Sequence, residues 1–459
     1  MASLRSRWPK AALAGLAGLA GLGLLAGCAT VDPRADWERV GQKTSLPEAP
    51  QLVWAQSQAD EERLAQGVRA LLANGLDQDK AVRVALINNR ALQAAFEEIG
   101  VSRADLVQAG LFSNPSLEAL LRWPIRGDDS GMNVEISGSV KVSDLWQLPL
   151  RRKVAEAALE RTILEVGEAV LATRREAKTA YARAYFLEMM RQQAAELVVL
   201  AEALEQASLR RREFGYLGDL AVYQAQEQVW QARLEASEIE MERNQARAAL
   251  VRVLGLVDGQ PPKLAAAPPE PAGGLPDLEP ALALAQAGRL DVQVARLKMV
   301  EAQRRARLER ARVVKDVHLG ADWERESGGG QLLGPKLGIE LPVFDQNQAG
   351  IARAEHQARQ WAKQVQALEG RVREDISADL ERVRFLRLKQ DYLDNRVGPL
   401  RRQALDYARQ WAGLMQLDQV SLLQAQRDLA RTPLMSLRNR LELHQALAGL
   451  EYHLGGRLP

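Results

Sequence analysis

The sequence contains one cysteine and four histidines among its 459 residues. A single cysteine, Cys28, excludes a disulfide within the chain, so stability must come from packing or assembly. The histidines are scattered, and no HExxH motif, Walker loop, GxSxG motif or cysteine ligand set occurs. The sequence therefore predicts neither an enzyme nor a metal site, and no bound cofactor.

The chain also lacks a large excess of positive or negative charge. The chain has 61 basic and 59 acidic residues, a formal net charge of +2. Removal of residues 1–27 takes away Arg5, Arg7 and Lys10 but no acidic residue, which leaves −1. Because no net basic field remains, a nucleic-acid partner is not predicted.

The amino terminus has the pattern of a signal peptide. A basic start precedes an apolar run at 11–26, which is too short and too glycine-rich for a membrane span. Leu25-Ala26-Gly27-Cys28 resembles the bacterial lipobox, which implies cleavage before Cys28 and a covalent N-acyl diacylglycerol on that residue. Ala29 stands where lipoproteins retained in the inner membrane usually have Asp, so the resemblance points to the outer membrane. An ordinary signal peptide with a stray thiol is the alternative.

The chain repeats itself at a spacing of 200 residues. Gln224-Ala225-Gln226 recurs as Gln424-Ala425-Gln426, and Leu254-Gly255 recurs as Leu454-Gly455. Collinear pairs of this kind indicate two homologous halves joined by a Pro/Gly-rich linker. The predicted organisation is a signal peptide at 1–27, an N-terminal lipidated segment at 28–79, a first repeat at 80–257, a linker at 258–279 and a second repeat at 280–456.

Both halves have the same predicted order of a helix, two strands and two long helices. The ranges are 80–110, 116–124, 132–143, 150–212 and 219–254 in the first half, and 290–313, 315–325, 332–343, 347–412 and 418–452 in the second. Pro399 and Pro433 are the prolines within the second pair of long helices. At about 1.5 Å per residue, the 150–212 helix alone would be ~90 Å long. The predicted class is mainly α with a small β part.

The strands alternate strictly between apolar and polar residues, as in MNVEISGSVKVS at 132–143. Such alternation suits a soluble sheet on a core, or a membrane barrel with lipid outside and water inside. In a barrel we expect the lipid-facing residues to include Val134, Ile136, Val140, Leu319 and Ile339. Trp123 and Trp323 lie beside the strand-to-strand loops, and Trp146 and Phe344 lie at the opposite ends, where two aromatic girdles would flank a lipid band.

Four strands cannot close a barrel. Lipid leaves each unpaired edge group unsatisfied, and the smallest single-chain barrels have eight strands. A membrane barrel would therefore require several copies of the chain. The composition of the long helices, rich in Ala, Glu, Gln, Arg and Leu, is typical of packed coiled coils.

In this order of elements the sequence resembles the TolC-type outer-membrane efflux family, and PVFDQNQAG resembles its heavy-metal exporter branch. The resemblance covers about 80–456. It depends on the duplicated order, on Asn114-Pro115 before the first strand, on LPVFDQNQAGIARAE (341–355) after the last strand, and on the turns GYLGDLAVYQAQ (215–226) and GLMQLDQVSLLQAQ (413–426).

The resemblance implies a homotrimer whose twelve-stranded barrel in the outer membrane of a Gram-negative bacterium continues into a long periplasmic α-helical barrel. It also implies the partners: outer-membrane lipid, a periplasmic adaptor protein, and an inner-membrane pump of the proton-driven resistance-nodulation type. The implied function is that of a passive exit duct. A type I secretion exit channel and a non-transporting envelope scaffold lipoprotein remain the alternatives.

By position, the resemblance assigns the periplasmic gate and adaptor tip to two turns. These hold Gly215, Tyr216, Leu217, Gly218 and Asp219 in the first half, and Gly413, Met415, Leu417 and Asp418 in the second. Many family members have an acidic ring near the second turn, but Ser421 and Gln424 occupy those places here. Asp418 is the nearest substitute, and both Asp219 and Asp418 could instead be helix N-caps.

Overall fold

The computed structural model describes residues 30–44, 52–123, 125, 131–257, 259–269, 274–413 and 419–458. The helices are α2 (Arg34–Thr44), α3 (Gln58–Leu72), α4 (Gln78–Asn88), α5 (Arg90–Ala109), α6 (Asp144–Glu213), α7 (Asp219–Val253), α8 (Leu278–Gly288), α9 (Leu290–Ala311), α10 (Gln348–Tyr392), α11 (Gly398–Gly413) and α12 (Gln419–His453). A π-helical segment, η2 (Leu393–Val397), joins α10 to α11. The strands are β1 (Ser116–Arg122), β2 (Asn133–Lys141), β3 (Val317–Arg325) and β4 (Gln331–Ile339).

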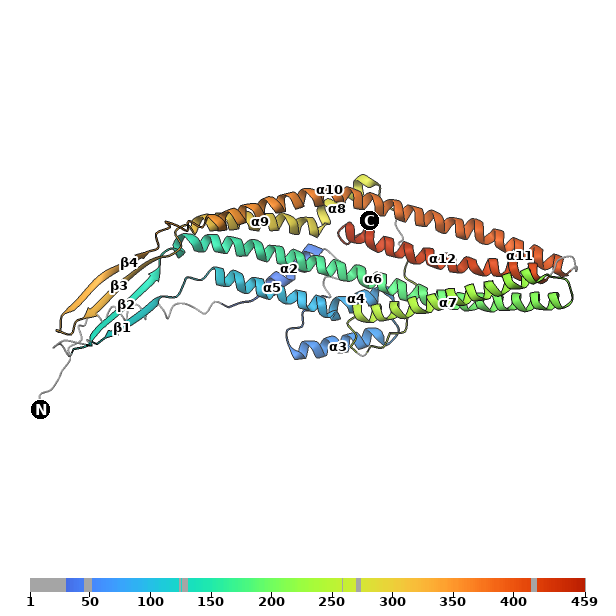
Figure 1. Cartoon of the computed structure of the whole chain (residues 1–459), viewed down its shortest axis with the longest axis horizontal. Coiled ribbons are helices and arrows are strands. Elements are labelled where there is room, and N and C mark those ends of the chain that lie inside the picture. The colour runs from blue at the N-terminus through green and yellow to red at the C-terminus, as the bar shows by residue number, and fades with distance from the viewer. Residues whose placement is uncertain are drawn as a thin grey trace, which may run out of the picture.

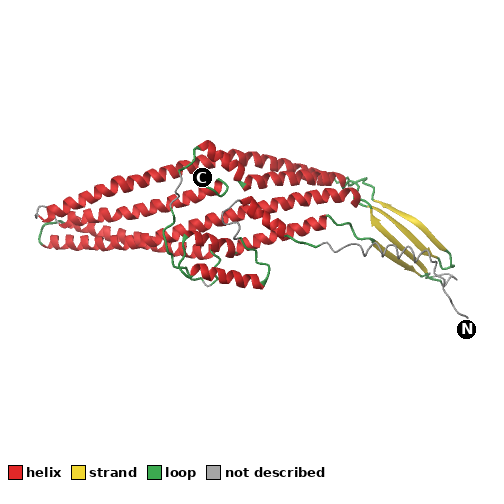
Figure 2. Cartoon of the chain, turned by 180° about the vertical axis from the view of Figure 1, so that it is seen from behind, coloured by secondary structure: helices red, strands yellow, loops and turns green. Residues whose placement is uncertain are grey.

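The elements form an elongated rod with the sheet at one end and helical hairpins at the other (Figure 1). The 70-residue α6 runs along most of the helical part, which at about 1.5 Å per residue corresponds to ~105 Å. Seen from behind, the strands again lie beyond the ends of the helices (Figure 2). Within the described ranges, no helix is both long enough and apolar enough to cross a membrane.

The two halves of the chain have the same order of elements. In the first half the order is the α4–α5 pair, β1, β2, α6 and α7. In the second half the corresponding order is the α8–α9 pair, β3, β4, the α10–η2–α11 helix and α12. The predicted mainly helical class with a small β part is confirmed. The predicted helix at 80–110 is divided, because the Asn89 side chain accepts a hydrogen bond from the Leu92 amide and starts a new helix there.

The repeated Leu-Gly dipeptide has a structural cause. Gly255 and Gly455 end their helices with φ of +66° and +83°, in the left-handed region that favours glycine. A Cβ on Gly255 would lie 2.3 Å from the Asn88 carbonyl oxygen, and one on Gly455 would lie 2.6 Å from the Gly288 Cα. Each glycine therefore lets the end of a long helix pack on the junction of the short helix pair in its own half.

The hydrophobic core follows the helices rather than the sheet. One cluster of buried side chains joins α4 and α5 to α6, with Phe96 and Ile163 fully buried. A second joins α8, α10 and α12 through residues such as Ile376 and Leu450, and a third joins α6 and α7 to α12. No residue of the four strands belongs to these clusters. The helical part is thus stabilised without help from the sheet.

Candidate functional sites: the sheet and the helical tip

The four strands form one antiparallel sheet in the order β1-β2-β3-β4, and its register collects the apolar side chains on one face. Ile136 pairs with Ala119 on one side and with Trp323 on the other. Val140 pairs with Leu319, which in turn pairs with Leu337. Side chains directly opposite each other in a sheet share a face. The apolar face consists of Leu117, Ala119, Leu121, Val134, Ile136, Val140, Val317, Leu319, Ala321, Trp323, Leu333, Leu337 and Ile339.

The opposite face carries the charged side chains. Glu135 pairs with Glu324 across β2 and β3, and Arg122 bridges the two carboxylates at 2.7 and 3.4 Å. Lys141 forms an ion pair with Asp316 at the helical end of the sheet. Ion pairs between neighbouring strands offset the repulsion of like charges on this face. The sheet therefore has one mainly charged face, which also holds Leu120 and Leu332, and one mainly apolar face, which has Arg325 at its loop end.

In the middle of β2 the apolar face is more exposed than the polar face. Ile136 on the apolar face is 40% exposed, whereas its neighbour Ser137 on the polar face is 6% exposed. In the described part of the chain, no helix packs closely on the strands, which contact mainly one another. The outer edges of β1 and β4 are unpaired in the single chain. A contiguous exposed apolar surface of this kind marks a membrane or protein interaction site.

The aromatic residues expected to form girdles lie at the two ends of the sheet. Trp123 follows β1 at the end of the strand-to-strand loops, and Trp323 lies near the same end of β3. Phe344 lies beyond β4 and is exposed. Trp146 belongs to the first turn of α6, and its indole N–H donates to the Ala311 carbonyl at 3.4 Å. The sequence analysis placed Trp146 at the end of a strand, but α6 begins at Asp144, earlier than expected.

The first hairpin turn lies between α6 and α7, at the end of the rod opposite the sheet (Figure 1). Gly215 has φ +74°, and Tyr216 is exposed beside it. Gly218 is the N-cap of α7, and Asp219 occupies the first helical position with Arg212 at 3.7 Å. The N-cap assignment considered for Asp219 is therefore wrong, although its carboxylate still favours the helix start through the helix dipole. Leu217 lies in the same turn.

The second hairpin turn is only partly described. Gly413 ends α11, whereas Met415, Leu417 and Asp418 lie outside the described residues. Cys28 lies outside them too. The gate and the lipidation site therefore stay predictions from the sequence.

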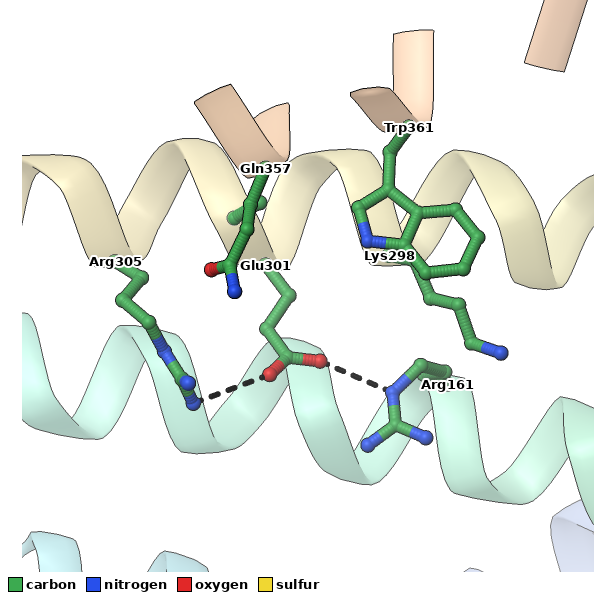
Figure 3. Close-up of a pocket in the computed structure, with 7 residues that line it drawn as sticks. Arg161, Lys298, Glu301, Arg305, Gln357 and Trp361 are labelled. Atoms are coloured by element: carbon green, nitrogen blue, oxygen red, sulfur yellow. Dashed lines mark hydrogen bonds and ion pairs between the residues drawn. The ribbon is translucent and has the colours of Figure 1, made fainter. Parts of the chain in front are cut away.

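Polar clefts lie between the helices along the rod. The cleft in Figure 3 has a volume of about 230 Å³ between α6, α9 and α10. Glu301 accepts hydrogen bonds from Arg161 at 3.0 Å and Arg305 at 3.4 Å, and the Lys298 ammonium lies 5.0 Å from the centre of the Trp361 ring. Among the described residues, no group of three or more His, Cys, Asp or Glu side chains could hold a metal ion.

Buried ion pairs join the two halves midway along the rod. Arg174 of α6 is 8% exposed and lies 2.5 Å from Glu451 of α12, which also pairs with Lys178 at 2.6 Å. The sequence analysis did not single out these residues, because their partners are 277 and 273 positions away. The pairs hold the first half against the end of the second.

A second ion cluster lies at the start of α9. Arg289 pairs with Asp291 at 2.7 Å and with Asp375 at 2.8 Å. Burial alone would raise the pKa of Asp291, but the hydrogen bonds from the Arg289 guanidinium outweigh it and hold that pKa below its usual value. Burial would lower the pKa of Arg289, and its two carboxylate partners raise it instead. Both groups are therefore charged at neutral pH.

Solved structures with the same fold are outer-membrane channels. The chain aligns with the Campylobacter jejuni CmeC outer membrane channel with a TM-score of 0.68 and 14% identity, covering 83% of this chain and 85% of that one. The open state of the Neisseria gonorrhoeae MtrE outer membrane channel gives a TM-score of 0.68 and 18% identity, with 83% and 89% covered. A CusC structure described as forming a transmembrane channel gives 0.66 and 17%, with 83% and 92% covered.

One curated relative is similar in sequence. The chain is 28% identical over 302 residues to the cobalt-zinc-cadmium resistance protein CzcC of Cupriavidus metallidurans, covering 62% of this chain and 68% of the relative. No protein-family model matches the chain. The structural alignments each cover 83% of this chain, and they confirm the resemblance seen in the sequence: the chain has the fold of the TolC-type outer-membrane efflux channels.

Proposed function

We propose that this protein is the outer-membrane exit duct of a tripartite efflux system, through which substrates pass passively to the exterior. The observation that carries the proposal is the sheet, with its exposed apolar face and its ion-paired polar face. Lipid would cover the first face and water in the pore would cover the second. The likeness of the fold to outer-membrane channels supports the same assignment.

The duct requires several copies of the chain. The free edges of β1 and β4 each present unpaired backbone groups, which lipid does not tolerate. Joining β4 of one copy to β1 of the next closes the sheet, and three copies give a barrel of about twelve strands. The helical walls of the three copies would enclose the periplasmic part of the pore. In this arrangement the hairpin turns lie at the periplasmic end.

The partners follow from this orientation. A periplasmic adaptor would contact the hairpin tips, including Tyr216 and Asp219 on the first tip, and would connect the duct to an inner-membrane pump of the proton-driven resistance-nodulation type. A diacylglycerol on Cys28 would anchor each copy to the outer membrane. Asp418 is the candidate for a carboxylate at the closed end of the pore.

The cargo that the comparisons favour is a divalent metal ion. The sequence relative CzcC is named for resistance to cobalt, zinc and cadmium. The metal is substrate here, and the duct needs no resident metal site to conduct it, because the pump upstream selects the cargo. Efflux of such ions would lower their concentration in the cell.

Deletion of the gene in its own host tests the cargo and the duct together. We expect cells without the protein to accumulate more cobalt, zinc or cadmium, and the wild-type gene on a plasmid to reverse the accumulation. Unchanged metal content together with sensitivity to organic drugs would reject metals as the cargo and leave the duct intact. Unchanged content and unchanged resistance to both classes would reject export.

A further inference from the structure

The last turns of α9 carry five arginines within nine residues, RRARLERAR at 304–312. Four of them have partners in the described part of the chain. Arg304 donates to a main-chain carbonyl of α6 at 2.6 Å. Three pair with glutamates at 2.6–3.4 Å, namely Arg305, Arg310 and Arg312. Arg307 is exposed, and neither a hydrogen bond nor an ion pair joins it to another described residue. Its guanidinium is therefore open to a ligand.

Arg307 lines a cleft between α9 and α10 with a volume of about 560 Å³, which we call the α9–α10 cleft. Arg310 and Arg359 line it as well, and Glu355 is the acidic residue among those that line it. The hydrogen bond from Arg310 lowers the pKa of Glu355, so this carboxylate is ionised at neutral pH. It offsets one of the three positive charges. The α9–α10 cleft therefore keeps a net charge of +2 and is suited to an anion.

The α9–α10 cleft opens on the convex side of the helices. The helices α5, α6, α9 and α10 lie side by side in this order. The cleft in Figure 3 spans α6, α9 and α10, and another spans α5, α6 and α9. A cleft that spans three neighbouring helices lies on the concave side of their layer. At about 100° per residue, the α9 residues of the α9–α10 cleft are turned by about 140–160° from those of the other two clefts. In the proposed barrel the convex side is the outside.

The α9–α10 cleft lies next to the aromatic girdle. Both helices reach the helical end of the sheet (Figure 1), where the exposed Phe344 lies between β4 and α10. The side chain of Asn347 donates to the Glu309 carbonyl at 2.8 Å and so holds this segment against the end of α9. Arg307 lies four residues before the end of α9, or about 6 Å. The headgroup layer of one leaflet is about 5–8 Å thick. With the girdle at the edge of the hydrocarbon, Arg307 is therefore at headgroup depth.

Arg359 approaches the same level from the other helix. It lies eleven residues after Gln348, the first residue of α10. Side chains of a helix lean toward its N-terminus. The N-terminus of α10 is at the sheet, so Arg359 leans toward the sheet, whereas α9 runs the opposite way and Arg307 leans away from it. The planar fork of arginine binds two phosphate oxygens through parallel hydrogen bonds. Two guanidinium groups that meet in one cleft are thus suited to a phosphate.

We propose that the α9–α10 cleft binds the phosphate of an anionic phospholipid in the inner leaflet of the outer membrane, with Arg307 and Arg359 as its ligands. A lipid is favoured over free phosphate because the cleft adjoins the exposed apolar face of the sheet, where the acyl chains of the same molecule would lie. Basic pockets at a membrane surface bind anionic headgroups. The proposal rests on the proposed function, since it takes that face to lie in lipid.

The response of purified full-length trimers to lipid tests the site. Trimers in a neutral detergent are mixed with phosphatidylglycerol, with phosphatidylcholine of the same acyl chains, or with inorganic phosphate, and the temperature at which they dissociate is measured on gels. We expect phosphatidylglycerol to raise this temperature most. Arg307→Gln and Arg359→Gln should each need about ten times more of it for the same rise, because a hydrogen bond between charged groups is lost. Arg305→Gln is the matched control, since it removes the same charge from the concave side of α9.

Failure of the site and failure of the proposed function give different results. Equal effects of the two lipids, or equal losses in Arg307→Gln and Arg305→Gln, would overturn the headgroup site and leave the duct intact. Inorganic phosphate that protects the trimers as well as phosphatidylglycerol does would overturn lipid as the occupant. An unchanged lipid response in Arg307→Gln, with less periplasmic protein recovered on the trimers, would overturn it in favour of an acidic protein surface. Absence of trimers from the wild-type protein would overturn both the site and the duct.

Discussion

A positive charge on the apolar face of the sheet should be far more damaging than the same charge one residue later. Ile136 lies in the middle of β2 between Ala119 and Trp323, on the face that we assign to lipid. Arg at the midplane of a bilayer costs about 2–4 kcal/mol. With three copies, the trimer would lose about 6–12 kcal/mol. We therefore expect Ile136→Arg to abolish most trimer assembly.

Ser137→Arg is the matched control. Ser137 pairs with Glu118 and Asp322 on the polar face, and Lys336 donates to its hydroxyl at 3.3 Å. The new guanidinium would displace the Lys336 ammonium and lie between two carboxylates on the face that we assign to pore water. The assay is the yield of heat-resistant trimers in outer-membrane fractions, normalised to the amount of each chain synthesised. Equal yields from the two variants, or a lower yield from Ser137→Arg, would refute the assignment of the faces.

Three other substitutions test separate parts of the account. Arg174→Ala leaves the buried Glu451 carboxylate with Lys178 alone, and we expect a loss of about 3–5 kcal/mol in the free energy of unfolding, measured by chemical denaturation. Hydrogen bonds from Arg289 lower the pKa of Asp291 in the folded state. The ionised Asp291 therefore stabilises the fold at pH values above the ordinary carboxyl pKa near 4, and this stabilisation is lost as the pH falls through the lower, folded-state pKa. In Asp291→Asn the melting temperature should therefore fall less steeply with decreasing pH below about 4 than in the wild-type protein. Cys28→Ala should abolish labelling by a radioactive lipid precursor, and continued labelling would contradict the lipobox.

The sequence predicted the order of elements because periodicity is a local property. Strict alternation identified the four strands, and their antiparallel pairing then collected the apolar residues on one face. The start of α6 was predicted too late, at residue 150, whereas the helix begins at Asp144 and contains Pro149. In the structure the Asp144 carboxylate accepts a hydrogen bond from the Ser113 amide at 2.6 Å and pairs with Arg151 at 3.1 Å. Such a tertiary anchor has no local signal.

Two further features were not predicted from the sequence. The Arg174 and Arg289 ion pairs join positions far apart in the chain, so spacing could not indicate them. The π-helical η2 did leave a signal in the sequence, because the apolar spacing slips between Tyr392 and Leu400. A one-residue slip in a long helical pattern indicates an insertion of this kind. The sequence analysis predicted one helix at 347–412, with Pro399 within it.

The conductance of the purified full-length protein in planar lipid bilayers tests the central claim most directly. The account predicts discrete current steps from inserted trimers, with small steps for the wild-type protein, whose periplasmic end is predicted to be closed. Leu417→Ala should enlarge the steps without any adaptor, because it loosens packing at the predicted gate, while Asp418→Asn should reduce any preference for cations. Trimers that insert into the bilayer but give no current steps, with or without the gate substitution, would contradict the account.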